Sequence, residues 1–150
     1  MSTHSAEAVI EQFSEYTDSA WEQGDLDTLD GLFAQDVIVH NVATGVDYEG
    51  LDEFKEWITN TRTAFPDFAV KYSDADFIVG ENKVASQWVV SGTHEGHLTD
   101  LDIEPTGRSI KLEGVTIYEL EDGMVNAAWW YFDAFDFLTQ LGVIPEDLVP

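Results

Sequence analysis

An aromatic run near the C-terminus ends in a carboxyl group, and this group is the first candidate for chemistry. Asp133 follows Trp-Trp-Tyr-Phe at 129–132. In a β-strand, side chains alternate between two faces, so Trp129, Tyr131 and Asp133 would share one face. If that face lines a cavity, burial among aromatic rings raises the pKa of the carboxyl group and suits it to remove a proton beside a carbonyl. The two aromatic side chains would then hold a flat, apolar substrate.

The same carboxyl group has a second interpretation. The segment DAFDFLTQLG at 133–142 is typical of a short helix with Asp133 at its N-cap and Gly142 just past its end. A capping carboxylate accepts backbone N–H bonds, which lowers its pKa and makes it a poor base. The residues alone favour the cap, and one carboxylate in one rotamer cannot serve both roles fully.

Histidine and tryptophan supply weaker signals. His40 lies in the apolar segment VIVHNV at 37–42, and a lone histidine there is typical of a partly buried, hydrogen-bonded side chain. His94 and His97 form the motif HEGH, but no third ligand is evident, so we predict no metal site. We expect His94 at the rim of a pocket and Trp88 in the core or the pocket wall.

Composition limits the classes of function. The chain has 150 residues, 44% of them apolar, which predicts a single domain over 1–150 with a sizeable core. The absence of cysteine excludes disulfides and thiolate chemistry. A formal net charge of −24 would repel nucleic acid and anionic membrane, so we expect neither as a partner. With no membrane-spanning run or signal peptide evident, we expect a cytoplasmic protein, and its evenly acidic coat predicts a halophilic source.

The pattern of elements predicts an α+β fold. Apolar residues recur at helical spacing early in the chain, whereas β-branched residues and turn signals dominate later. Asp122 and Gly123 predict a hairpin turn between the last two strands. The expected helices cover 6–21, a segment after Asp25, a segment after Asp52, and 134–141; the expected strands cover 37–42, 68–79, 83–94, 108–121 and 124–133.

Several segments, taken in order, resemble the SnoaL-like polyketide cyclases of the NTF2-like superfamily. The resemblance implies a cone in which a bent antiparallel sheet wraps around N-terminal helices and encloses an apolar pocket. It also implies a homodimer and the use of no cofactor. The segments are GDLDTLDGLFAQDVIVHN (24–41), YEGLDEF (48–54), AFPDF (64–68), GTHEG (92–96), PTGRSIKLEGVTIYELEDGMV (105–125) and DFLTQLGVIP (136–145).

The resemblance also implies roles for two residues. Asp133 matches the acid/base of the family's cyclases, and His40 matches a histidine that lines the pocket and would orient or polarise a substrate oxygen. The implied reaction is ring closure or isomerisation of an apolar carbonyl compound. Two alternatives stay open: a non-catalytic module that binds a small molecule, and a hydrolase that uses a carboxylate-activated water.

Overall fold

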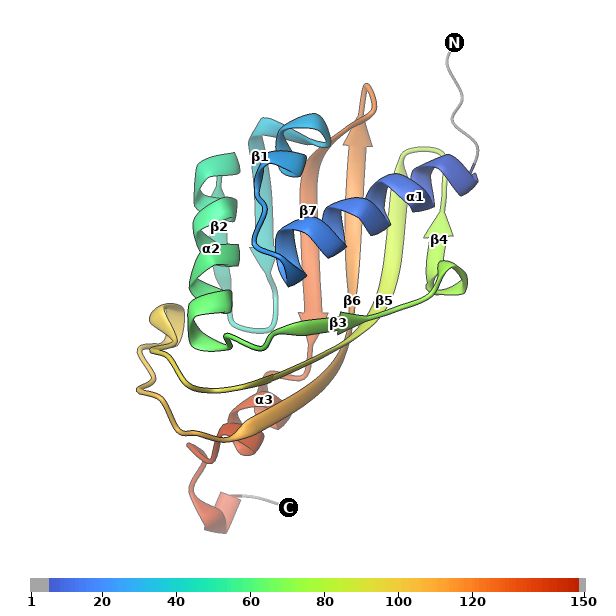
Figure 1. Ribbon diagram of the computed structural model, residues 1–150. Coiled ribbons are helices and arrows are strands. Elements are labelled where there is room, and N and C mark those ends of the chain that lie inside the picture. Colours follow the sequence, from blue (N-terminus) through green and yellow to red (C-terminus); the bar gives the residue numbers. More distant parts are fainter. Residues whose placement is uncertain (1–5, 149–150) are drawn as a thin grey trace.

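The computed structural model describes residues 6–148 (Figure 1). It begins with two helical segments that follow one another directly in the sequence. Helix α1 spans Ala6–Tyr16 and continues as a π-helical turn, η1, over Thr17–Glu22. The predicted helix at 6–21 is therefore confirmed. The helix predicted after Asp25 is wrong in type, because only a 3-10 turn, η2, forms over Asp27–Gly31.

The second α-helix forms where the sequence predicted it. Helix α2 spans Leu51–Ala64 and follows Gly50, whose φ of 95° falls in the left-handed region that glycine tolerates. Two acidic residues in the first turn, Asp52 and Glu53, stabilise the helix because they lie at the positive end of its dipole. The helix buries Phe54, Trp57 and other apolar side chains on one face.

Seven strands form one curved sheet in the order β2-β1-β7-β6-β5-β3, with β4 also paired to β5. The pairs are antiparallel except β1 with β7, which is parallel. The expected strand at 68–79 is broken by a 3-10 turn, η3, over Asp74–Asp76, and β2 was not predicted. The strands are β1 Phe33–Asn41, β2 Val46–Glu49, β3 Ala69–Lys71, β4 Phe77–Val79, β5 Lys83–Thr93, β6 Ser109–Glu121 and β7 Met124–Phe132.

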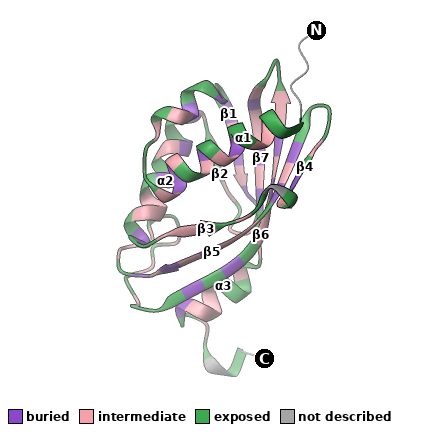
Figure 2. Ribbon diagram, turned by 45° about the vertical axis from the view of Figure 1, so that its right-hand side comes forward, coloured by how far each residue is buried: buried purple, intermediate pink, exposed green. Residues whose placement is uncertain are grey.

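The helices and the sheet enclose an aromatic core. Helices α1 and α2 cover the concave face of the sheet, and α3 (Ala134–Leu141) lies at its far end, as predicted for 134–141. Buried residues run along the strands under these helices (Figure 2). The α+β class is confirmed. In the described part of the chain, every helix is too short or too polar to cross a membrane.

A β-bulge in β7 decides which side chains enter the core. Across β6 and β7, Glu119 pairs with Ala127 but the next residue, Leu120, pairs with Val125, so Asn126 is the extra residue. An extra residue reverses the alternation of the residues beyond it. Val125 is fully buried before the bulge, whereas Ala128 and Trp130 are the buried residues after it.

Candidate functional site

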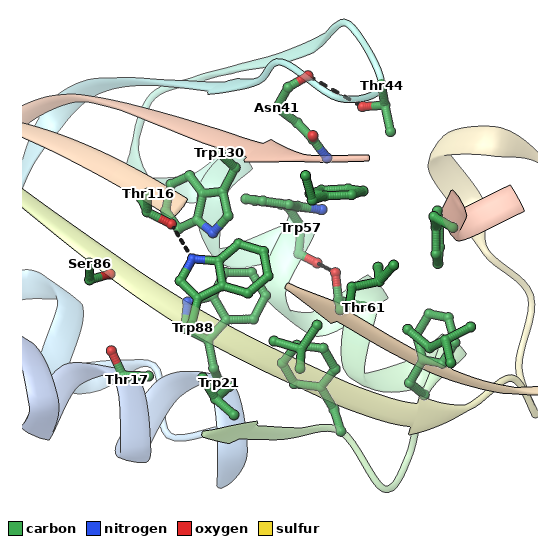
Figure 3. Close-up of a pocket in the computed structure, with 18 of the residues that line it drawn as sticks. Thr17, Trp21, Asn41, Thr44, Trp57, Thr61, Ser86, Trp88, Thr116 and Trp130 are labelled. Atoms are coloured by element: carbon green, nitrogen blue, oxygen red, sulfur yellow. Dashed lines mark hydrogen bonds between the residues drawn. The ribbon is translucent and has the colours of Figure 1, made fainter. Parts of the chain in front are cut away.

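A deep pocket lies between the concave face of the sheet and the helices. The space within it, its open mouth included, is about 970 Å³. Aromatic rings from η1, α2 and the sheet dominate its walls (Figure 3). Such walls bind flat, apolar molecules by burial and ring stacking. The main aromatic side chains are Trp21, Trp57, Phe68, Trp88, Trp130 and Phe132.

The inner end of the pocket carries neutral polar groups that form hydrogen bonds with one another. The indole N–H of Trp88 donates to the hydroxyl of Thr116 over 2.8 Å. The Tyr118 hydroxyl lies 3.4 Å from that of Tyr16. Burial raises the pKa of both tyrosines well above their usual value, so both stay neutral at physiological pH. This end of the pocket therefore offers hydroxyl groups and rings, but no charge.

Trp88 lines the pocket, as expected, because the facing strand makes room for it. Gly114 is its partner across β5 and β6. A Cβ atom at Gly114 would lie 2.3 Å from Cη2 of the Trp88 ring, closer than carbon atoms approach without a shift. The glycine thus allows the indole to lie flat against β6, where its N–H reaches Thr116.

Asp100 stands at the mouth of the pocket, in the 3-10 turn η4 (Thr99–Leu101) of the loop between β5 and β6. Of the described residues that line the pocket, it alone carries a carboxylate. Its Oδ2 accepts a hydrogen bond from the Tyr48 hydroxyl. Burial first, and then this hydrogen bond, raise the pKa of Tyr48 far above its usual value. The Tyr48 ring stacks on Trp57, with ring centres 4.8 Å apart, so the carboxylate is tied to the aromatic wall.

Asn41 is the other distinctive polar residue of the pocket. It is the last residue of β1 and only 5% exposed. Its backbone carbonyl accepts the N–H of Gly45 over 2.8 Å, which closes the turn into β2. Its side-chain Oδ1 is buried and has no hydrogen-bond partner among the described residues.

The expected position of Asp133 inside the pocket is wrong. Asp133 is exposed and is not among the residues that line the pocket. It is the N-cap of α3, where its Oδ1 accepts the backbone N–H of Asp136 over 3.0 Å. The capping interpretation is therefore confirmed. The bulge at Asn126 explains the difference, because it turns Trp130 and Phe132 into the pocket, and Ala128 into the core, instead of Trp129, Tyr131 and Asp133.

The expected position of His40 in the pocket is also wrong. The register pairs His40 with Asp47 on one side and with Trp129 on the other. Its Nδ1 lies 2.8 Å from Oδ1 of Asp47, and its ring stacks on Trp129 with centres 5.5 Å apart. Neither His40, Trp129 nor Tyr131 lines the pocket, and Tyr131 is 40% exposed. Catalytic roles for Asp133 and His40 remain predictions, and their positions do not support those roles.

His94 lies behind the pocket wall and not at its rim. It is fully buried, its Nδ1 accepts the Thr106 N–H over 3.2 Å, and its ring packs on Phe65, which lines the pocket. Burial lowers the pKa of His94, which keeps the ring neutral. His97 turns away to Asp102, 3.1 Å from its Nε2. Within residues 6–148, no three side chains of the metal-binding types gather into one group.

Sequence reasoning missed two polar residues of the pocket, Asp100 and Asn41, for identifiable reasons. Asp100 lies in the segment LTDLD, where nothing separates it from the other acidic residues of the chain. Alternation along a strand turns Asn41 away from the pocket when its neighbour His40 is taken to face it. The signal for Asn41 is the alternation of Val37, Val39 and Asn41, all buried on one face of β1.

The chain matches the model of the SnoaL-like polyketide cyclase family over residues 11–141. This match covers most of the domain. The protein belongs to the SnoaL-like polyketide cyclase family. No curated protein matches the chain, so the family assignment rests on the family model.

Solved structures show the same fold as this SnoaL-like protein. A protein from Jannaschia sp. CCS1, assigned as a SnoaL-like polyketide cyclase, is 20% identical over 91% of this chain and 92% of its own, with a TM-score of 0.79. IdmH from Streptomyces antibioticus, assigned as a polyketide cyclase, is 25% identical over 93% and 100%, with a TM-score of 0.70. A Catenulispora acidiphila protein with a ketosteroid isomerase-like fold is 19% identical over 93% and 98%, with a TM-score of 0.71. The fold is thus the NTF2-like, ketosteroid isomerase-like one that the resemblance implied.

Proposed function

We propose that this SnoaL-like protein binds a flat, apolar carbonyl compound and catalyses proton transfer on it, leading to ring closure or isomerisation. The observation that carries the proposal is Asp100, the single carboxylate among the described residues that line an otherwise neutral aromatic pocket. A base of this kind, held next to an apolar wall, suits the removal of a proton beside a carbonyl group.

The contacts of Asp100 define its role in the step. Its Oδ2 is engaged by the Tyr48 hydroxyl, which leaves Oδ1 for the substrate. Oδ1 takes a proton from the carbon next to the carbonyl, and the electron pair of that C–H bond moves into an enolate. The protonated carboxyl group then returns the proton at another position, which completes an isomerisation. Alternatively, the enolate carbon forms a bond to a second carbonyl carbon of the same molecule, the π electrons of that C=O bond move to its oxygen, and the resulting alkoxide takes the proton from the carboxyl group. Trp57 and Trp130 form the walls against which a planar substrate would lie.

A simple ketone tests this step without knowledge of the natural substrate. We expect the protein to speed exchange of the α-protons of 2-tetralone in D₂O, followed by proton NMR. Asp100→Asn should lower the protein-dependent rate by roughly 100-fold, within the range of general base catalysis. Asp133→Asn is the matched control, because it makes the same change outside the pocket. An Asp100→Asn protein that binds 2-tetralone and keeps the full exchange rate would refute the role of Asp100.

A second candidate is binding without catalysis. It is supported by β7, whose pocket-lining side chains, Trp130 and Phe132, carry no acid or base. It is also supported by the exposure of Asp100 at the mouth of the pocket. Binding alone predicts quenching of tryptophan fluorescence by 2-tetralone with no exchange above that of the buffer, in the wild type and in Asp100→Asn alike.

A further inference from the structure

Two tryptophans in the wall of the pocket carry indole N–H groups that have no hydrogen-bond acceptor. Trp57 of α2 and Trp130 of β7 both line the pocket, and they are only 9% and 6% exposed. Among the described residues, no group accepts a hydrogen bond from either N–H. Polar groups in the interior nearly always have a partner, so two free donors in one cavity call for an explanation.

The other indoles of the pocket have their acceptors within the protein. The N–H of Trp21 donates to the Tyr16 hydroxyl over 2.9 Å, and the N–H of Trp88 donates to the Thr116 hydroxyl over 2.8 Å. The pocket therefore holds two kinds of indole, and those of the second kind keep a donor for a bound molecule.

The two free indoles stand next to the residue that engages the proposed base. The Tyr48 hydroxyl donates to Asp100, and the Tyr48 ring stacks on Trp57 with ring centres 4.8 Å apart. The rings of Trp57 and Trp130 are in contact, with centres 5.2 Å apart and planes at 88° to each other (Figure 3). One continuous set of contacts thus runs from the carboxylate through Tyr48 to both free N–H groups.

Proton removal by Asp100 creates a charge that the pocket has to stabilise. The substrate becomes an enolate, and negative charge collects on its oxygen. Among the described residues that line the pocket, none is lysine, arginine or histidine. The hydroxyl proton of Tyr48 is already donated to Asp100. Neutral N–H donors that face the oxygen can lower the barrier in their place, because such donors act strongly where water is excluded.

We propose that the indole N–H groups of Trp57 and Trp130 donate to the carbonyl oxygen of the substrate and stabilise the charge that develops on it. This inference rests on the proposed proton transfer at Asp100 and adds two catalytic residues to it. Both N–H groups keep their protons, while the electron pair of the broken C–H bond moves towards the oxygen that they bind. Their hydrogen bonds strengthen as the charge grows, so they should affect kcat more than KM.

Replacement of single indoles by β-(3-benzothienyl)alanine, which has sulfur in place of the N–H and nearly the same shape, tests the two hydrogen bonds. In Trp57→benzothienylalanine and in Trp130→benzothienylalanine, kcat for the exchange of 2-tetralone α-protons should fall about 100-fold, as for other single oxyanion donors. KM should change by less than about threefold, since the lost interaction forms fully only in the transition state. The control is Trp129→benzothienylalanine, because Trp129 does not line the pocket and this variant should keep the wild-type rate.

A second measurement detects the hydrogen bonds in the wild-type protein. The chain has five tryptophans, and ¹⁵N-labelled tryptophan gives one indole N–H signal for each. Tetralin lacks the oxygen of 2-tetralone but has nearly the same outline, so it corrects for the effect of the ligand ring on these signals. We expect 2-tetralone, and not tetralin, to move the signals of Trp57 and Trp130 downfield. Trp57→Phe and Trp130→Phe each remove one signal and so assign it.

The possible outcomes separate this inference from the proposed function. Full exchange rates in the Trp57 and Trp130 variants would overturn the role of the indoles and leave that of Asp100 intact. The same holds for indole signals that respond equally to 2-tetralone and tetralin, and for variants in which KM rises while kcat is unchanged. If the wild type binds 2-tetralone without exchange above that of the buffer, or does not bind it, the proposed proton transfer is overturned together with the inference.

Discussion

Replacement of Asp133 by alanine separates the two roles that the sequence allowed for this residue. In the structure its Oδ1 accepts one backbone N–H, that of Asp136, at the start of α3. Loss of an N-cap acceptor costs about 1 kcal/mol, within a range of roughly 0.5–2 kcal/mol. For a chain of this length, 1 kcal/mol corresponds to a fall in Tm of about 2–4 °C. Asparagine is also a good N-cap, so Asp133→Asn should stay within about 0.5 kcal/mol of the wild type.

The measurement is urea unfolding followed by far-ultraviolet circular dichroism in molar potassium chloride. High salt screens the attraction between the carboxylate and the helix dipole but leaves the capping hydrogen bond in place. Asp136→Asn is the control, since it removes one charge from the same turn and keeps its backbone N–H. The exchange of 2-tetralone protons should be unchanged within twofold in all three variants. A folded Asp133→Asn protein that has lost this exchange would show that Asp133 is the base, despite its position outside the pocket.

Three further outcomes follow from the packing and the charge. Gly114→Ala should force the Trp88 ring out of place, lower the free energy of unfolding by about 1–3 kcal/mol and weaken binding of 2-tetralone at least tenfold. Gly31→Ala, where a Cβ would meet nothing within 4 Å, should change neither quantity. Because the pKa of Tyr48 is raised, its contribution to the free energy of unfolding should be complete below about pH 10 and should fall as the pH rises further. Tyr48→Phe should make that fall less steep and should lower the free energy of unfolding by about 1–3 kcal/mol, because the hydrogen bond to Asp100 is lost. Urea unfolding measures both effects. With a net charge of −24, Tm should rise with potassium chloride concentration, and a Tm independent of salt would contradict the halophilic interpretation.

The helices and long strands could be predicted because their signals are local. The helical spacing of apolar residues before Tyr16 and the Asp122–Gly123 turn act over a few residues, and both structures form. The segment after Asp25 also has helical spacing, but its leucines reach the core from a single 3-10 turn before β1 begins. Periodicity alone does not determine the structure of so short an apolar segment, so the burial of its leucines against the rest of the fold determined it.

The site could be predicted only in part, because it depends on which face of each strand turns inward. β7 is aromatic on both faces, so its composition does not distinguish Trp129 from Trp130. The choice is made by the bulge at Asn126, which arises from how β7 pairs with β6 and β1 and has no local signal in the sequence. In β1 the buried valines Val37 and Val39 do carry such a signal, and they point to Asn41.

The bulge in β7 changes which face of the strand lines the pocket, and this changes the polar groups that a ligand would meet there. Had the outer face turned inward, a carboxylate, an imidazole and two rings would have lain together in the cavity. Instead His40 pairs with Asp47 outside, and the inner face of β7 contributes no acid or base. The polar groups left to the pocket include one amide, one carboxylate near the mouth and two indole N–H groups, those of Asn41, Asp100, Trp57 and Trp130. We therefore expect a ligand to place its apolar body towards Trp88 and its carbonyl oxygens towards the mouth. Substitutions at the mouth should then change selectivity and exchange, whereas substitutions at the inner end should change affinity alone.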